Sequence, residues 1–246
     1  MSIKIGHASV SEKGTINGKV GDQTGKEVCT RSWYSNPWSV LLVCTDKEIA
    51  KKAAQEMQYA CDNKNIGYGQ SDRRSAYNSA LVNGKTFKKA KGNTDCSQLV
   101  ASCYILAGLK ISPDCYTGNL RKALLATGKF KEYTDPKYLK SDAYAEVGAV
   151  YLKEYDHTAM ALENGSKAIE AEKKNTSSIK AGKKLTLKDT PCYVSSIIKT
   201  SYTSKSGTYY VWSEEAVNGR IRITNKASRV GVSGQVTCWI DKKFAE

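Results

Sequence analysis

A cysteine at the predicted start of a helix is the residue in this sequence best placed to do chemistry. Cys96 follows Asp95, a good N-cap residue, and Gln98 completes a capping-box pattern. A helix N-terminus presents unpaired N–H groups and the positive end of the helix dipole, and both favour a thiolate. Asp95 opposes this, so a nucleophilic Cys96 needs a base that takes its proton and stays beside it as a cation. The alternative is a buried structural cysteine.

The chain offers two histidines as that base. His157 opens a predicted strand that runs to residue 162, and a base at a strand start is held rigidly. His7 is the rival base; its other interpretation is a structural or substrate-contacting side chain. A further strand predicted over Lys167–Ala171 carries Glu170, which could hydrogen-bond the far ring nitrogen of His157 and fix its tautomer. Otherwise Glu170 is a solvated carboxylate.

The order of these residues resembles the NlpC/P60 family of cysteine peptidoglycan hydrolases, with a helix-opening Asp-Cys-Ser, a strand-opening histidine and a polar residue one hairpin later. The resemblance implies an α+β, papain-like domain in which Cys96 attacks, His157 shuttles the proton and Glu170 orients it. The family usually carries a tyrosine before the cysteine. Tyr68 takes that place, as a substrate contact or as an aromatic side chain packed on the core. Glu170 stands where many members have histidine, and Gln98 stands where glycine is common.

The N-terminal region resembles phage endolysins that carry such a domain, over residues 6–9, 21–28 and 31–34. This resemblance covers about residues 1–171 and implies an enzyme that degrades bacterial peptidoglycan. It also implies that four residues contact the substrate: Tyr68, Asp95, His7 and Gln23. It leaves open which bond is cut, an N-acetylmuramoyl-L-alanine amide or a peptide bond of the stem or cross-bridge.

Composition predicts a soluble protein of one or two domains, with 246 residues that are 40% hydrophobic and 25% charged. The first residues lack the apolar run of a signal peptide, and no segment approaches the roughly 18 apolar residues of a membrane span. We therefore expect a protein made in the host cytoplasm that acts on the wall after release. The eight cysteines are expected to be reduced there. Five of them are interpreted as small buried hydrophobes: Cys29, Cys44, Cys61, Cys103 and Cys115.

No CxxC pair is present, which argues against zinc, and Cys–His chemistry implies no cofactor. The net charge of +14 implies an anionic partner. Residues 176–246 hold 12 Lys+Arg and 5 Asp+Glu, a net of +7, which leaves 26 and 19, also +7, for residues 1–175. The basic residues form no RNA-binding motif, so an anionic wall polymer fits better than nucleic acid. A non-catalytic basic protein that binds wall polymer or nucleic acid is the alternative to the enzyme.

Several elements are expected around the site. Residues 1–45 are interpreted mostly as loops, and Asp46 is a predicted N-cap of a helix that ends near Asn63. Further helices are expected over Ser71–Val82 and Asn119–Thr127. The apolar face of the first helix is predicted to comprise Ala50, Ala53, Ala54, Met57, Ala60 and Cys61.

Residues 172–184 lose the apolar pattern and are predicted to link the catalytic domain to a second domain over 185–246. Short strands separated by turns indicate a small all-β barrel there. They are expected at 185–187, 192–194, 208–212, 220–224 and 235–240. The segment resembles bacterial SH3-type wall-binding modules, although Cys238 stands where these often have glycine. The resemblance implies that Tyr209, Tyr210 and Trp212 bind the wall; alternatively, these aromatic side chains form the core.

Overall fold

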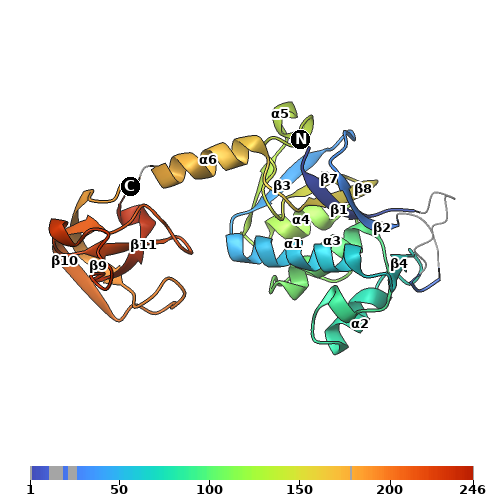
Figure 1. Cartoon of the computed structure of the whole chain (residues 1–246). Helices are drawn as coiled ribbons and strands as arrows, with labels where there is room; N and C mark the ends of the chain where they lie inside the picture. The colour runs from blue at the N-terminus through green and yellow to red at the C-terminus, as the bar shows by residue number, and fades with distance from the viewer. Residues whose placement is uncertain (1, 11–18, 22–26, 178, 246) are drawn as a thin grey trace. The chain divides into compact units, whose positions relative to one another are not determined.

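The computed structural model describes residues 2–10, 19–21, 27–177 and 179–245 (Figure 1). The chain divides into two compact units, Met1–Ala168 and Ile169–Glu246, which we call the first and second units. The fold is mixed α/β in the first unit, and the second contains a separate antiparallel sheet. No helix in the described part of the chain is long and apolar enough to cross a membrane.

The boundary between the units falls inside helix α6 (Ser166–Ser177). The strand predicted over Lys167–Ala171 is therefore wrong, and the first residues of the predicted linker continue this helix. The physical reason is composition, because the run is rich in Ala, Glu and Lys, which are strong helix formers.

A six-stranded antiparallel sheet forms the centre of the first unit, in the order β2-β1-β8-β7-β3-β6. Its strands are β1 (Lys4–Ala8), β2 (Val28–Ser32), β3 (Val40–Cys44), β6 (Phe130–Tyr133), β7 (Val150–Lys153) and β8 (His157–Ala161). The interpretation of residues 1–45 as loops is wrong for β1 and β2. These strands are short, and Gly6 lies within the first of them, where a Cβ would lie 2.4 Å from the Met57 side chain.

Helices α1 (Lys47–Asp62) and α3 (Cys96–Leu106) lie on one face of this sheet (Figure 1). The prediction for α1 is confirmed: Asp46 caps it by accepting from the Ile49 N–H, and its buried residues are the six predicted ones. Three shorter helices are α2 (Ser75–Val82), α4 (Leu120–Leu125) and α5 (Pro136–Leu139). A two-stranded parallel sheet joins β4 (Ile66–Tyr68) to β5 (Gly92–Thr94), directly before the cysteine.

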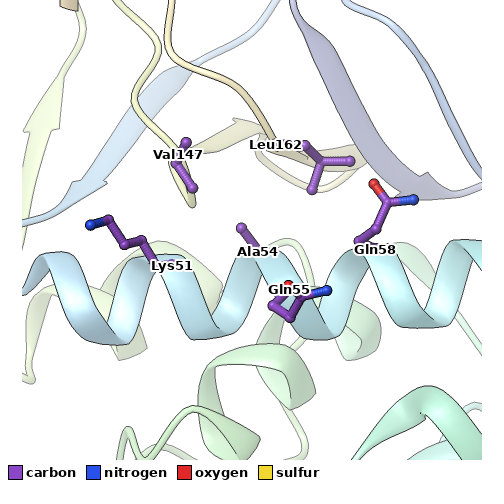
Figure 2. A pocket seen from close by; sticks show the side chains of 6 residues that line it. All are labelled: Lys51, Ala54, Gln55, Gln58, Val147 and Leu162. Atoms are coloured by element: carbon purple, nitrogen blue, oxygen red, sulfur yellow. The ribbon is translucent and has the colours of Figure 1, made fainter.

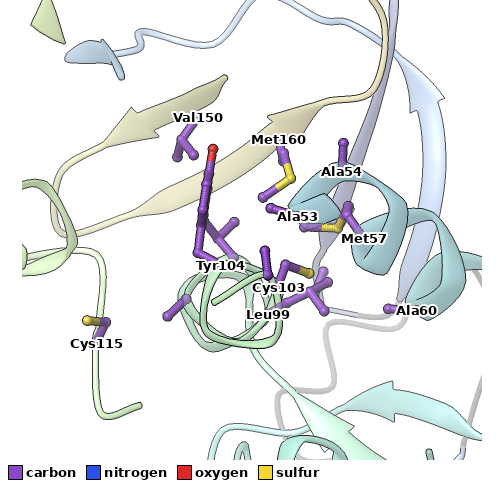
Figure 3. Close-up of a cluster of buried hydrophobic side chains, with 14 of the residues drawn as sticks. Ala53, Ala54, Met57, Ala60, Leu99, Cys103, Tyr104, Cys115, Val150 and Met160 are labelled. Atoms are coloured by element: carbon purple, nitrogen blue, oxygen red, sulfur yellow. The ribbon is translucent and has the colours of Figure 1, made fainter. Parts of the chain in front are cut away.

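The core lies on both faces of the sheet. Figure 3 shows Met57 from α1 and Leu99 and Cys103 from α3 packed beside Met160 of β8, and all four are fully buried. On the opposite face, Ala159 belongs to a second buried cluster that includes Trp38, Leu41 and Tyr151. Because both faces are covered, side chains at strand ends and in loops are the ones able to meet a substrate.

A pocket of about 300 Å³ opens along the flank of α1 (Figure 2). It holds none of the residues predicted to act in catalysis or binding. Its lining comprises Lys51, Ala54, Gln55, Gln58, Val147 and Leu162.

The second unit contains a four-stranded antiparallel sheet in the order β12-β11-β10-β9. Its strands are β9 (Lys184–Cys192), β10 (Thr203–Val211), β11 (Arg220–Thr224) and β12 (Cys238–Asp241). Strand β9 replaces two of the predicted strands, because Pro191 is tolerated on an edge strand and does not end it. The core of this unit includes Val211, Ile221, Ile223 and Ile240.

A disulfide joins Cys192 of β9 to Cys238 of β12, with the Cα atoms 5.8 Å apart. The expectation that all eight cysteines are reduced is wrong for this pair; the other six are thiols. Reciprocal backbone hydrogen bonds between Tyr193 and Trp239, of 2.8 and 2.9 Å, also connect the two edge strands. The sequence could not predict this disulfide, because its two cysteines are 46 positions apart and only the folded sheet brings them together.

Candidate functional site

Cys96 is the first residue of α3 and is 7% exposed. Burial, together with the charge of Asp95, raises the pKa of its thiol to about 12. Hydrogen bonds from the backbone N–H groups of Thr158 and Ser97 act in the opposite direction. The resting group is therefore a thiol, because burial outweighs the stabilisation of a thiolate that a helix N-terminus provides.

Asp95 caps α3 as predicted. Its carboxylate accepts hydrogen bonds from the Gln98 N–H at 2.7 Å and the Ser97 hydroxyl at 2.9 Å, and it pairs with the Arg73 guanidinium at 2.7 Å. The Gln98 side chain donates to the Ser102 hydroxyl at 2.8 Å rather than returning to the cap, so the capping box is half formed. These contacts fix the start of the helix, and a substrate contact by Asp95 stays a prediction.

The two histidines meet across neighbouring strands. His7 lies on β1 and His157 opens β8, and the two strands pair antiparallel. His7 Nδ1 lies 3.2 Å from His157 Nε2, and the ring planes meet at 83°. His7 is 2% exposed. The strand that flanks β8 opposite β7 is thus β1, whereas Glu170 is an exposed residue of α6 in the second unit.

Both imidazoles are neutral near pH 7. Burial, together with the charges of His157 and Arg31, lowers the pKa of His7 to about 3. Burial also lowers the pKa of His157, while the charge of Asp156 acts in the opposite direction. Two neutral rings in contact share one proton between the facing nitrogens, so the tautomer of one fixes the tautomer of the other.

Aromatic side chains surround the histidine pair. The rings of Tyr34 and Trp38 lie 6.5 and 6.1 Å from the His157 ring, inclined to it by 28° and 27°. The Tyr34 hydroxyl lies 3.4 Å from His7 Nδ1, and the Cys29 sulfur lies 3.6 Å from His7 Nε2. Sequence reasoning missed Trp38, and it used Tyr34 only as part of a resemblance. The cluster of aromatic residues directly before the Val40 strand was the available signal.

Thr158 connects the cysteine to the histidines, because its backbone N–H lowers the pKa of the Cys96 thiol and it directly follows His157. Cys96 also contributes to the raised pKa values of Tyr34 and Tyr68, so both phenols lie within its electrostatic reach. Among the described residues, no direct hydrogen bond joins the Cys96 thiol to His157. Catalytic hydrogen bonds are often long before substrate binds.

Tyr68 and Gln23 are the two other predicted substrate contacts, and both stay predictions. Tyr68 ends β4, is 6% exposed, and its hydroxyl accepts a hydrogen bond from Gln70 at 3.0 Å. Gln23 lies outside the described residues.

In the described ranges, no cluster of three or more His, Cys, Asp or Glu side chains could hold a metal ion.

The predicted wall-binding residues divide between the two faces of the second sheet. Tyr209 packs against the core, on the side of buried Val211. Tyr210 and Trp212 lie on the other side by strand alternation. There the Arg222 guanidinium lies 4.5 Å from the Trp212 ring centroid and 5.3 Å from that of Trp239.

A thiol that opens a helix, close to a buried pair of histidines, supplies the groups that nucleophilic cysteine chemistry needs. The sequence that builds this site, residues 5–168, matches the family model of the endolysin-like domain. The chain belongs to the endolysin-like domain family, which makes it an endolysin-type protein and supports a wall-lytic activity on peptidoglycan. No match was found among curated proteins or among solved structures.

Proposed function

We propose that the first unit is a cysteine hydrolase of the NlpC/P60, papain-like type that cuts an amide or peptide bond of peptidoglycan. The Cys96 sulfur attacks the carbonyl carbon while His157 takes the thiol proton. His157 then gives that proton to the leaving amine as the C–N bond breaks. Water, activated by His157, cleaves the thioester, and the cysteine recovers its proton. The observation that carries this proposal is the placement of Thr158, which directly follows His157 and whose backbone N–H acts on the Cys96 thiol and lowers its pKa.

In this mechanism His7, rather than Glu170, orients the base. The tautomer that leaves His157 Nδ1 free to accept a proton has its Nε2–H donating to His7 Nδ1, over the 3.2 Å contact. His7 Nε2–H then faces the Cys29 sulfur, a weak acceptor. A single tautomer of His7 therefore satisfies its contacts with both His157 and Cys29. The contact with a neutral acceptor persists when His157 becomes an imidazolium.

The resting pair is uncharged, because the pKa of Cys96 is raised and that of His157 is lowered. The thiolate forms only when substrate is attacked, when the N–H groups of Thr158 and of the helix start stabilise it. Backbone N–H groups at the start of α3 also provide the oxyanion site for the tetrahedral intermediate.

Zymography tests the enzyme proposal. Wild-type protein should clear a gel that contains bacterial walls, and Cys96→Ala should not. Cys103→Ala is the matched control, because it removes another buried thiol from the same helix and should still clear. Clearing by Cys96→Ala, or no clearing by wild type, would reject the mechanism. Activity should survive EDTA, and mass spectrometry of the digested walls distinguishes an amidase from an endopeptidase.

A second role concerns the second unit, which we propose is an SH3-like wall-binding domain. The supporting observation is the outward face formed by Tyr210, Trp212, Arg222 and Trp239. Aromatic rings provide stacking area for sugars or peptides, and the net charge of +7 over residues 176–246 attracts an anionic polymer.

A further inference from the structure

Arg31 presents a positive charge at the edge of the proposed active site. It is exposed on β2, paired in register with Ile5 of β1, and its guanidinium lies 4.8 Å from the centroid of the Tyr34 ring. Tyr34 in turn lies beside the His157 ring and places its hydroxyl near His7. The guanidinium is therefore one aromatic ring away from both histidines.

No carboxylate within the described ranges lies at ion-pair distance from Arg31. Other arginines of the first unit do pair with acids: Arg73 with Asp95 at 2.7 Å, and Arg121 with Glu132 at 2.7 Å. Arg31 instead contacts the face of the Tyr34 ring. This contact fixes the orientation of the guanidinium and leaves its N–H groups able to bind another partner.

Without a bound anion, the charge of Arg31 disfavours the protonated form of the two histidines. It lowers the pKa of both His7 and His157, so it opposes the imidazolium that the mechanism requires. An anionic group of the substrate would neutralise this charge and remove the opposition at the moment of attack. The position thus fits a partner that arrives with the substrate.

We infer that Arg31, supported by Tyr34, binds a free carboxylate of the peptidoglycan stem peptide close to the scissile bond. This inference rests on the proposed hydrolase function. A guanidinium binds a carboxylate through two parallel hydrogen bonds. A carboxamide of the same shape offers one acceptor, no charge, and an NH₂ group that meets the guanidinium donors. Arg31 therefore makes the enzyme selective for stem peptides that keep this carboxylate over amidated ones.

The test uses two soluble stem-peptide fragments that differ only in this carboxylate or carboxamide. Wild type should cleave the carboxylate form with a kcat/KM about tenfold to a hundredfold higher, the size expected of a charge-assisted hydrogen bond. Arg31→Gln should remove the preference, and Arg31→Lys should keep part of it. Lys131→Gln is the matched control, because it removes an exposed positive charge from β6, at the opposite edge of the same sheet, and should retain the full preference.

The outcomes separate this inference from the function on which it rests. Cleavage by wild type with an unchanged substrate ratio in Arg31→Gln would overturn the carboxylate site and leave the hydrolase intact. Failure of wild type to cleave walls or either fragment would reject the hydrolase itself. If Arg31→Gln turns over neither fragment, calorimetric binding of both to Cys96→Ala, with and without Arg31→Gln, supplies the same ratio. Equal ratios in the two proteins would reject the carboxylate site.

Discussion

His7 Nδ1 lies 3.2 Å from His157 Nε2, which leaves Nδ1 of His157 as the nitrogen able to take a proton from a thiol. The contact connects the first strand of the chain to a strand 150 residues later. Because burial keeps His7 neutral, it can accept a hydrogen bond from the protonated ring without itself becoming charged. In the proposed mechanism a neutral residue orients the base, where many catalytic sites use a carboxylate.

The first prediction concerns the unequal roles of the histidines. His157→Ala should lower kcat/KM on a soluble wall fragment by roughly 10²- to 10⁴-fold, the range for loss of a general base. His7→Ala should leave a measurable rate, reduced about tenfold to a hundredfold, as expected for one hydrogen bond to a charged group. The effect of His7→Ala should appear in kcat with KM little changed, because His7 does not touch the substrate in this mechanism.

Two substitutions at His7 distinguish its proposed role in orienting His157 from a role in packing. His7→Asn keeps a side-chain acceptor and should recover part of the rate, whereas His7→Leu fills similar space without an acceptor and should not. If His7→Ala abolished turnover and His157→Ala retained it, the assignment of the base would be reversed.

The second prediction is a loss of stability in mild acid. The pKa of His7 falls from 6.5 to about 3 on folding, so between these values the unfolded chain binds a proton that the folded chain does not. Stability from this group is complete above about pH 6.5 and decreases as the pH falls towards 3. At pH 5 the loss should be about 2 kcal/mol. His157, with its lowered pKa, adds a loss of the same sign.

Urea unfolding of the full chain at pH 7.5 and at pH 5 measures this loss. Most carboxylates are still ionised at pH 5, so the histidines dominate the interval. His7→Asn should unfold with a smaller difference between the two pH values. An equal pH dependence in wild type and His7→Asn would show that His7 titrates normally in the folded protein.

The sequence predicted the elements whose signals are local. The signals for α1 and its Asp46 cap, for the capped start of α3 at Cys96 and for the strand that opens at His157 are all contained in short windows. The role of His7 depends on pairing between β1 and β8, which no local pattern specifies. The predicted strand that carries Glu170 is wrong for a different reason: a third hairpin strand was expected where the local composition favours a helix.

The third prediction concerns the Cys192–Cys238 disulfide, which closes a loop of 46 residues between two edge strands. Cys192→Ala, or mild reduction, should destabilise the second unit by roughly 2–4 kcal/mol. Cys115→Ala is the control, because it removes a buried thiol from the first unit. Thermal unfolding followed by tryptophan fluorescence should report the change through Trp212 and Trp239. Thiol titration of the denatured, unreduced protein should find six thiols rather than eight if the bond is present.

The last prediction concerns the outward face of the second unit. The Arg222 guanidinium contacts the rings of both Trp212 and Trp239, so one positive charge and two aromatic rings form a single surface. Arg222 also pairs with Glu215 at 2.8 Å. If this surface binds wall polymer, full-length Cys96→Ala protein, which cannot digest the walls in this proposal, should sediment with purified walls. Added Arg222→Gln or Trp212→Ala should weaken that binding about tenfold, within the range of one cation or stacking contact.

Lys188→Gln is the matched control, because it removes an exposed charge from β9, away from these rings, and should bind nearly as wild type does. High salt should weaken the binding of every variant, because it screens the attraction between a basic protein and an anionic polymer. The Trp212→Ala loss should persist in high salt, since stacking does not depend on ionic strength. Equal losses in Lys188→Gln and Arg222→Gln would indicate attraction by net charge alone, and no sedimentation at either salt would remove the targeting role.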